Sequence, residues 1–241
     1  MSLVSAAPRL AATVVPLRDA PTGSLEVLLC RRSADVRAAS GAMVFPGGTL
    51  DEVDLRLAQL VDKNVRQAFS RALGTPEGLV FALAASREMT EEVGFAPLGL
   101  RPYRERVARG EVDWIDAARE SGSFWDLEAL EYLAHWITPL ERPHRFDTRF
   151  FLSECGDQVP EPDGHEIVDA AWVSPALALE QFTNGHWTML TPTVAVLRWL
   201  EGFSSCQFAL EAARRRTVTT IQPRVVVRDG REVVEVPEPG L

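Results

Sequence analysis

Three glutamates near the middle of the chain are spaced so that they can share one face of a helix. Glu88, Glu91 and Glu92 occupy positions i, i+3 and i+4, so that their carboxylates project from the same side. Like charges at this spacing destabilise a helix by roughly 0.2–0.5 kcal/mol per pair. A hard divalent cation, which takes oxygen ligands, would turn that repulsion into binding. The alternative is a solvated acidic helix face without chemistry.

Two neighbouring features favour a site over a solvated face. Arg87 lies four residues before Glu91 and can hold its carboxylate in place. The short apolar run 42–45 ends at Pro46-Gly47-Gly48, where two glycines after a proline permit a tight turn. An exposed backbone carbonyl or amide in that turn can reach a metal ion or a phosphate oxygen.

Strand and helix signals alternate along the chain and predict a mixed α and β protein. The glutamate helix has clear ends, since Thr75 is suited to its N-cap, Pro76 to its first position and Gly94 to its C-terminal stop. Apolar runs predict strands at 10–16, 25–30, 42–45, 134–138, 148–153 and 170–173. Further helices are predicted at 52–73, 112–120, 175–182, 193–200 and 205–215.

Composition limits the classes of partner. The 241 residues carry a formal net charge of −9, which excludes a global attraction to nucleic acid or to anionic membranes. A phosphate-bearing substrate therefore needs a local arginine cluster or a metal ion. The three cysteines have no metal-ligand spacing, and with no signal-peptide or membrane-span pattern we expect a cytoplasmic protein that contacts no membrane.

The glycine turn and the glutamate helix together resemble the Nudix box. Gly48 is followed after five residues by Asp54, and Arg-Glu-Met-Thr-Glu-Glu-Val-Gly-Phe over 87–95 matches the second half of that motif at every defined position. Two features depart from the pattern: aspartate replaces glutamate at 54, and 32 residues separate Asp54 from Arg87 where the family has seven. The helix at 52–74 is thus an insertion. A similar interrupted box, after a sequence like that at 45–54, occurs in the branch that includes acyl-CoA-cleaving enzymes.

The resemblance implies magnesium-dependent or manganese-dependent hydrolysis of a diphosphate. It implies that Glu91 and Glu92 are metal ligands, that Glu88 is a further ligand or the base, and that the backbone of Gly48 completes the shell. Arg87 and Glu91 then belong to the catalytic group with Glu88. One acidic partner normally comes from outside the box, and Glu166 is our candidate, with a solvated loop carboxylate as the alternative.

The stretch before the box narrows the substrate. Arg31, Arg32 and Arg37, followed by Gly41 and the Phe-Pro-Gly-Gly turn that contains Gly47, resemble the signature of Nudix coenzyme A diphosphatases, with Cys30 where that signature has threonine. Arginine forks bind phosphate oxygens bidentately, so we expect these three arginines and Gly47 to bind substrate. The alternative is that one of the arginines pairs with a surface carboxylate instead.

Three functions therefore remain open. The first is cleavage of coenzyme A or acyl-CoA to 3′,5′-ADP and (acyl-)phosphopantetheine. The second is a Nudix diphosphatase for ADP-ribose, NADH or a nucleotide sugar. The third is a binding or regulatory protein that kept the fold and lost turnover, although such proteins usually lose the glutamates that are present here.

The resemblance implies an α/β fold, the Nudix α/β/α sandwich with a mixed sheet between helices. We expect a Nudix hydrolase domain over residues 1–203, with the insertion at about 52–74 and a surface segment at about 103–131. A C-terminal extension over 204–241 adds a helix and a valine-rich hairpin that turns at Asp229-Gly230. Because an exposed hairpin edge can pair with another chain, the extension is a candidate contact for a homodimer.

Overall fold

The computed structural model describes residues 7–36, 39–96, 98–228, 230–238 and 241. Its centre is an eight-stranded mixed sheet, in the order β3-β2-β1-β6-β5-β8, with β4 paired to β1 and β7 paired to β2. The strands are β1 (Arg9–Asp19), β2 (Leu25–Arg32), β3 (Met43–Val44), β4 (Gly47–Thr49), β5 (Glu131–Ile137), β6 (Phe146–Glu154), β7 (Ile167–Val173) and β8 (Thr220–Ile221).

The sheet combines parallel and antiparallel pairs. β1 runs parallel to β6, with Val14 opposite Phe151, and antiparallel to β2 and β4. β5 is antiparallel to β6 and parallel to β8. The pairing of β4 with β1 matters for function, because it places Gly48 opposite Ala12 in the middle of the sheet.

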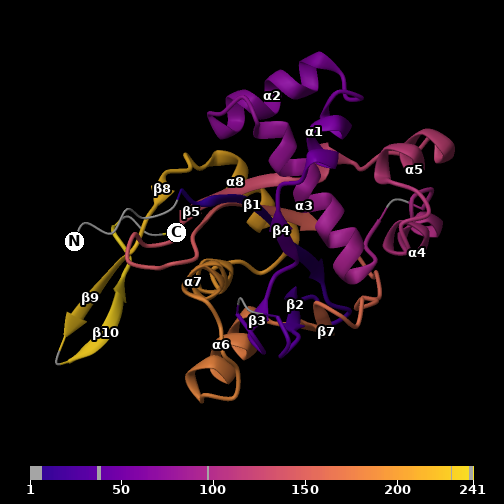
Figure 1. The fold of residues 1–241 in the computed structure, drawn as a ribbon. Coiled ribbons are helices and arrows are strands. Elements are labelled where there is room, and N and C mark those ends of the chain that lie inside the picture. Colours follow the sequence, from indigo (N-terminus) through magenta and orange to yellow (C-terminus); the bar gives the residue numbers. More distant parts are fainter. Residues whose placement is uncertain (1–6, 37–38, 97, 229, 239–240) are drawn as a thin grey trace.

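Helices cover both faces of this sheet (Figure 1). The helices are α1 (Glu52–Ala58), α2 (Lys63–Leu73), α3 (Gly78–Val93), α4 (Arg104–Ala108), α5 (Trp114–Ser121), α6 (Pro175–Thr183), α7 (Thr191–Leu200) and α8 (Cys206–Arg215). Two short 3-10 turns, η1 (Arg101–Tyr103) and η2 (Leu127–Ala129), flank α4 and α5.

Alternating side chains of β1 separate two apolar cores. Ala12 and Val14 pack with α1, α2, α3 and α5, whereas Val15 and Leu17 pack with α6, α7 and α8. Successive strand residues point to opposite faces of a sheet, so one central strand supplies both cores. The predicted α/β/α sandwich with a mixed sheet is confirmed.

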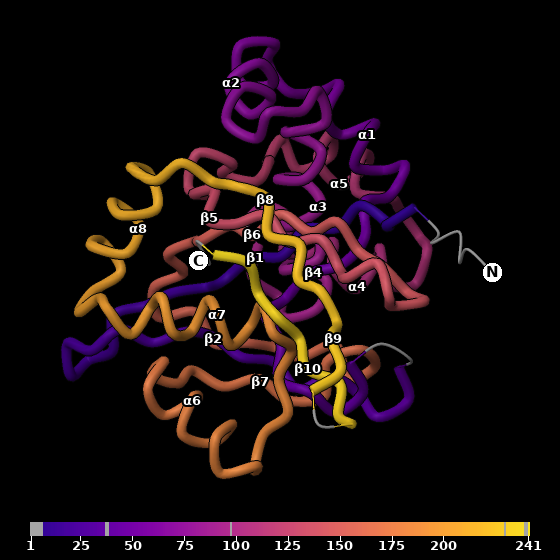
Figure 2. Tube along the Cα trace, turned by 90° about the vertical axis from the view of Figure 1, so that its left-hand side faces the viewer, coloured from indigo at the N-terminus to yellow at the C-terminus, as the bar shows by residue number. Residues whose placement is uncertain are grey.

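The inserted helix was predicted as one continuous element, and this prediction is wrong. α1 ends at Ala58, and α2 begins at Lys63 after Asp62, whose side chain accepts a hydrogen bond from the Asn64 backbone amide as an N-cap. Aspartate at an N-cap starts a new helix because it satisfies a free amide of the first turn. Both helices pack against α3 and lie above it in Figure 2.

The glutamate helix begins later than the sequence predicted. α3 starts at Gly78, after a turn over 75–77, so that neither Thr75 nor Pro76 has the predicted position. A Cβ atom at Gly78 would overlap the carbonyl of Phe69 in α2, which shows how closely the insertion returns to α3. The predicted C-terminal end is confirmed, since Gly94 caps the helix in the left-handed region with φ 77°.

The C-terminal extension is joined to the sandwich. α8 contributes Cys206, Ala209 and Leu210 to the core on the α7 side, and β8 adds a strand beside β5. The hairpin of β9 (Arg224–Arg228) and β10 (Arg231–Glu235) projects from the body (Figure 1). Its turn residue Asp229 lies outside the described residues. Among the described helices, none is long and apolar enough to cross a membrane.

Candidate active site

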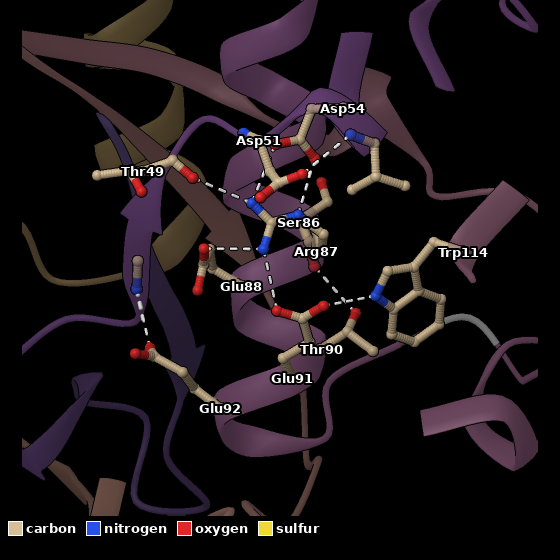
Figure 3. Close-up of polar contacts among 12 residues, drawn as sticks. Thr49, Asp51, Asp54, Ser86, Arg87, Glu88, Thr90, Glu91, Glu92 and Trp114 are labelled. Carbon is tan, nitrogen blue, oxygen red and sulfur yellow. Dashed lines mark hydrogen bonds and ion pairs between the residues drawn. The ribbon is translucent and has the colours of Figure 1, made fainter. Parts of the chain in front are cut away.

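The site is built on the C-terminal half of α3, where Arg87 is the central residue (Figure 3). Its guanidinium donates from Nε and Nη2 to the two carboxylate oxygens of Asp54, over 2.8 and 2.9 Å. Nη1 donates to Glu88 over 2.8 Å and to Glu91 over 3.0 Å, and Nη2 also reaches the Thr49 carbonyl at 3.1 Å. One buried cation therefore holds three carboxylates and the end of β4 together.

Asp54 meets the glutamate helix despite the 32 intervening residues. It is fully buried on α1, and its Oδ2 also accepts a hydrogen bond from the Asp51 backbone amide over 2.8 Å, completing a capping box at the helix start. The α1–α2 insertion thus returns the chain to α3 and leaves both halves of the box in contact. In this structure Asp54 is a partner of Arg87 and is more deeply buried than any of the three glutamates.

Glu92 is the most deeply buried of the three glutamates. Its Oε2 accepts a hydrogen bond from the Gly47 backbone amide over 2.9 Å, and its Oε1 is buried without a hydrogen-bond partner. Burial, followed by the nearby charge of Glu88, raises the pKa of Glu92 well above its ordinary value. A nearby cation would relieve both the buried oxygen and the repulsion.

Glu88 lies between the glycine turn and Arg87. A Cβ atom at Gly48 would overlap the Glu88 carboxylate, so the absence of a side chain at 48 makes room for it. Burial raises the pKa of Glu88 to about 7, and this effect outweighs the adjacent Arg87 cation, which lowers it. A carboxylate with a pKa near neutrality can exchange a proton at physiological pH.

Glu91 is held from two sides. Arg87 binds Oε2, and the indole Nε1–H of Trp114 donates to Oε1 over 2.5 Å. The side chain of Glu91 is 35% exposed, against 17% for Glu88 and 4% for Glu92, so it is the most accessible of the three glutamates. Arg104 also donates to the Glu91 backbone carbonyl, from Nε over 3.2 Å and from Nη2 over 2.9 Å.

The structure brings one of the predicted arginines and the predicted loop carboxylate to the cluster. Arg32 Nη2 pairs with Glu166 Oε2 at 3.1 Å, and Nη1 lies 3.9 Å from the unpartnered Oε1 of Glu92. Among the described residues Arg31 forms no ion pair, although it lies beside Arg32 on β2. Arg37 lies outside the described residues.

The donor set suits a hard divalent cation, but the carboxylates do not form a finished cage. Within the described part of the chain, no three histidine, cysteine, aspartate or glutamate side chains stand in a geometry that could hold a metal ion. The arrangement explains why: Arg87 binds Glu88 and Glu91, while Glu92 turns its second oxygen toward Gly47. The buried Oε1 of Glu92, which accepts no hydrogen bond and has Arg32 only at 3.9 Å, is the observation that fits a cation beside these groups.

Sequence reasoning missed the side chains that reach α3 from the surface segment. Trp114 and Trp125 are buried in the core on the α3 side of the sheet, but the sequence pattern gave neither them nor Arg104 a role at the glutamates. The structure shows that Trp125 Nε1 donates to Thr90 over 3.0 Å, next to the Trp114 bond with Glu91. No periodicity could reveal these contacts, because they depend on how α4 and α5 pack beside α3.

The three cysteines carry no site chemistry. Cys30, Cys155 and Cys206 are buried free thiols, as expected for small apolar residues. Burial raises the pKa of each thiol above its ordinary value, to about 12 for Cys155. The thiolate is the reactive form, so burial and the raised pKa values disfavour a nucleophilic role for these residues.

Comparison with known proteins gives one family. The sequence profile of the NUDT19 Nudix domain matches residues 64–200, which is more than half of the chain. The acyl-coenzyme A diphosphatase NUDT19 of Homo sapiens is 28% identical and covers 79% of this chain, while the chain covers 64% of the human protein. The protein of the same name from Gallus gallus is 28% identical, over 75% of this chain and 62% of its own length. The chain thus spans less than two thirds of these relatives.

A solved structure agrees with the fold. The crystal structure of a NUDIX hydrolase from Alicyclobacillus acidocaldarius aligns with a TM-score of 0.70 and 27% sequence identity. The alignment covers 86% of this chain and 97% of that chain. Most of the chain therefore has a counterpart in a known structure.

Proposed function

The chain belongs to the NUDT19 Nudix domain family, and from this premise we propose that it hydrolyses the diphosphate of coenzyme A or acyl-CoA with the help of magnesium or manganese. The products would be 3′,5′-ADP and phosphopantetheine or its acyl form. Relatives named acyl-coenzyme A diphosphatase support this substrate class. The upstream arginines and the Phe-Pro-Gly-Gly turn support it independently.

The observation that carries the proposal is the carboxylate pair Glu88 and Glu92 beside the glycine turn. Both side chains have raised pKa values because they are buried, and each is raised further by a neighbouring carboxylate. Strongly perturbed pKa values of this kind cluster at functional sites. A divalent cation with a diphosphate is the ligand that the family membership implies.

Each residue has a distinct role in this proposal. Glu91 and Glu92 would hold the metal with the backbone of Gly48, and Glu88 would be a further ligand or the base that accepts a proton from water. A bound divalent ion neutralises phosphate charge and lowers the pKa of its water. Arg87 keeps the glutamates in place, since Asp54 and the Thr49 carbonyl hold its guanidinium.

Arg32, beside the glutamates, would supply the positive charge that binds a substrate phosphate. Arg32 lies between Glu92 and Glu166, and its Nε is buried without a partner. A guanidinium with an unused donor can turn toward a phosphate oxygen and form a bidentate contact. Glu166 is more than half exposed, so it can move as the substrate enters and act as the acidic partner from outside the box.

A substrate panel tests the proposal. The purified chain is incubated with Mg²⁺ and, in turn, coenzyme A, an acyl-CoA, ADP-ribose, NADH and a nucleotide sugar, and products are separated by chromatography. We expect coenzyme A or its acyl form to be cleaved well ahead of the others, with 3′,5′-ADP as a product. Faster cleavage of ADP-ribose or NADH would show that the substrate is not coenzyme A, but would still agree with a diphosphatase activity. No cleavage of any compound would favour a binding protein.

Two further expectations are proposals at the level of the whole molecule. A homodimer through the β9–β10 hairpin is supported by the exposure of Val227, Val233 and Val234, and light scattering after size exclusion measures the mass directly. A cytoplasmic location is supported by the buried free thiols, which suit a reducing compartment. Fractionation of the cells that produce the protein tests it.

A further inference from the structure

The segment between α3 and β5 reaches the glutamate helix with three long side chains. Arg104 of α4 binds the Glu91 carbonyl, Trp114 of α5 binds the Glu91 carboxylate, and Trp125 binds the hydroxyl of Thr90. The first two contacts fall on the same residue, at its backbone and at its side chain. The segment therefore contacts α3 at one of the proposed metal ligands.

The contact of Trp114 with Glu91 is directional and shielded. Trp114 is only 2% exposed, and its ring packs edge-on against Trp125, with centroids 5.4 Å apart. At the start of α5, Asp113 caps the helix through the Asp116 amide and pairs with Arg56 of α1 at 3.1 Å. The indole is thus fixed by packing on one side and by a helix start on the other, while its N–H points at Glu91 (Figure 3).

The Trp114 indole, an uncharged hydrogen-bond donor, orients the Glu91 carboxylate without occupying all of its metal-binding capacity. Arg87 alone draws Glu91 toward the arginine and its other partners, Asp54 and Glu88. The indole fixes the second oxygen on the opposite side, so that the carboxylate plane is set by two donors. A carboxylate oxygen has two lone pairs, and an indole N–H uses one of them, which leaves coordination capacity for a cation.

We propose that Trp114 is a positioning residue for Glu91, holding its carboxylate in the orientation that binds the metal ion. This inference rests on the proposed function, in which Glu91 is a metal ligand. Groups that orient ligands typically change metal affinity or activity by about 10–100-fold when they are lost. The surface segment of this chain is then part of the active-site framework, through one hydrogen bond.

Trp125 supplies the matched control. It lies next to Trp114, is also buried, and also donates an indole hydrogen bond to α3. Its acceptor is Thr90, whose side chain points to the Ser86 and Phe95 carbonyls and not to the glutamates. Trp114→Phe and Trp125→Phe each remove one indole N–H and keep an aromatic ring, but only the first removes a bond to Glu91.

Mn²⁺ affinity, measured by electron paramagnetic resonance on the purified chain without substrate, tests the proposal. We expect Trp114→Phe to weaken Mn²⁺ binding about tenfold and Trp125→Phe to change it less than twofold. Glu91→Gln is the reference for complete loss of this ligand. Equal affinities for Trp114→Phe and wild type, with Glu91→Gln clearly weaker, would overturn the positioning role and leave the proposed function intact. A wild-type chain with no Mn²⁺ affinity would overturn both.

A second measurement applies if either phenylalanine variant does not fold. In a ¹⁵N-labelled chain the six tryptophans each give one indole N–H signal, and those of Trp114 and Trp125 are assigned by indole-selective labelling and conservative variants of their neighbours. We expect Mg²⁺ to shift the Trp114 signal most, and Glu91→Gln to abolish that shift. The positioning role would be overturned if Mg²⁺ did not shift the Trp114 signal but did shift other signals in a way that Glu91→Gln abolishes.

Discussion

Removing the Asp54 carboxylate tests whether the two separated halves of the box are held together by the buried ion pair. In Asp54→Ala, Arg87 loses two charge-assisted hydrogen bonds of 2.8 and 2.9 Å, and the Asp51 amide loses its acceptor. Breaking a buried ion pair costs about 3–5 kcal/mol. Because Arg87 keeps Glu88, Glu91 and the Thr49 carbonyl, we expect the lower end of that range.

The expected loss of unfolding free energy is therefore about 3 kcal/mol from the ion pair, with roughly 1 kcal/mol more from the lost cap. For a chain of this size each kcal/mol lowers the melting temperature by about 2–4 °C. Asp51→Ala is the control, because it removes the side-chain cap of α1, which accepts from the Val53 amide and forms the other half of the capping box, but leaves the Asp54–Arg87 pair; it should cost about 1 kcal/mol.

Thermal melts followed by circular dichroism compare the two variants with the wild type at pH 7. We expect Asp54→Ala to melt roughly 8–16 °C lower than the wild type and well below Asp51→Ala. If both variants melt at the same temperature, the Asp54–Arg87 pair contributes nothing beyond a helix cap, and the reasoning about the closed insertion is refuted.

Two other predictions concern the glycine turn and Glu88. Gly47→Ala should destabilise the fold, because its Cβ would overlap the β1 backbone at Ala12 and Thr13. Gly48→Ala should mainly displace the Glu88 carboxylate and lower activity at least tenfold. Thermal melts and turnover rates of both variants separate these two effects. For Glu88, a native pKa of about 7 against an ordinary 4.5 means that the folded chain binds more protons between these values. The contribution of Glu88 to the unfolding free energy of the metal-free chain should thus be greatest below pH 4.5 and fall by up to about 3 kcal/mol as the pH rises to 7. In Glu88→Gln the unfolding free energy should fall less over the same pH range. Urea unfolding in the presence of a chelator measures both proteins, and an equal pH dependence of their unfolding free energies would contradict this prediction.

The sequence was sufficient for the parts of the site that depend on local spacing. The i, i+3 and i+4 glutamates and the cap at Gly94 follow from residues close together in the chain, whereas Gly47 and Gly48, predicted as a tight turn, lie in strand β4 paired with β1. All described strands of the central sheet except β4 and β8 were predicted, because each of them is a short apolar run between turn signals. Their pairing order, with β4 against β1, could not be derived from those runs.

The path of the inserted segment, with two helices instead of one, could not be predicted from the sequence. Asp62 carries a signal for a helix start, but the apolar periodicity on both sides of it continues, and that continuity favoured one helix. The return to α3 depends on close packing at Gly78 and on the burial of Asp54, which are tertiary effects. The contacts of Trp114 and Arg104 with Glu91 span 23 and 13 residues and depend on packing in the same way.

The central claim is that the carboxylates of α3 support metal-dependent cleavage of a coenzyme A diphosphate. The most direct test is the Mg²⁺-dependent release of 3′,5′-ADP from coenzyme A by the wild type, Glu91→Gln and Glu92→Gln, with melts to show that each variant is folded. We predict that each substitution lowers turnover by at least about a hundredfold, since it removes a proposed metal ligand. Turnover equal to the wild type in both folded variants would show that the three glutamates are only a helix face.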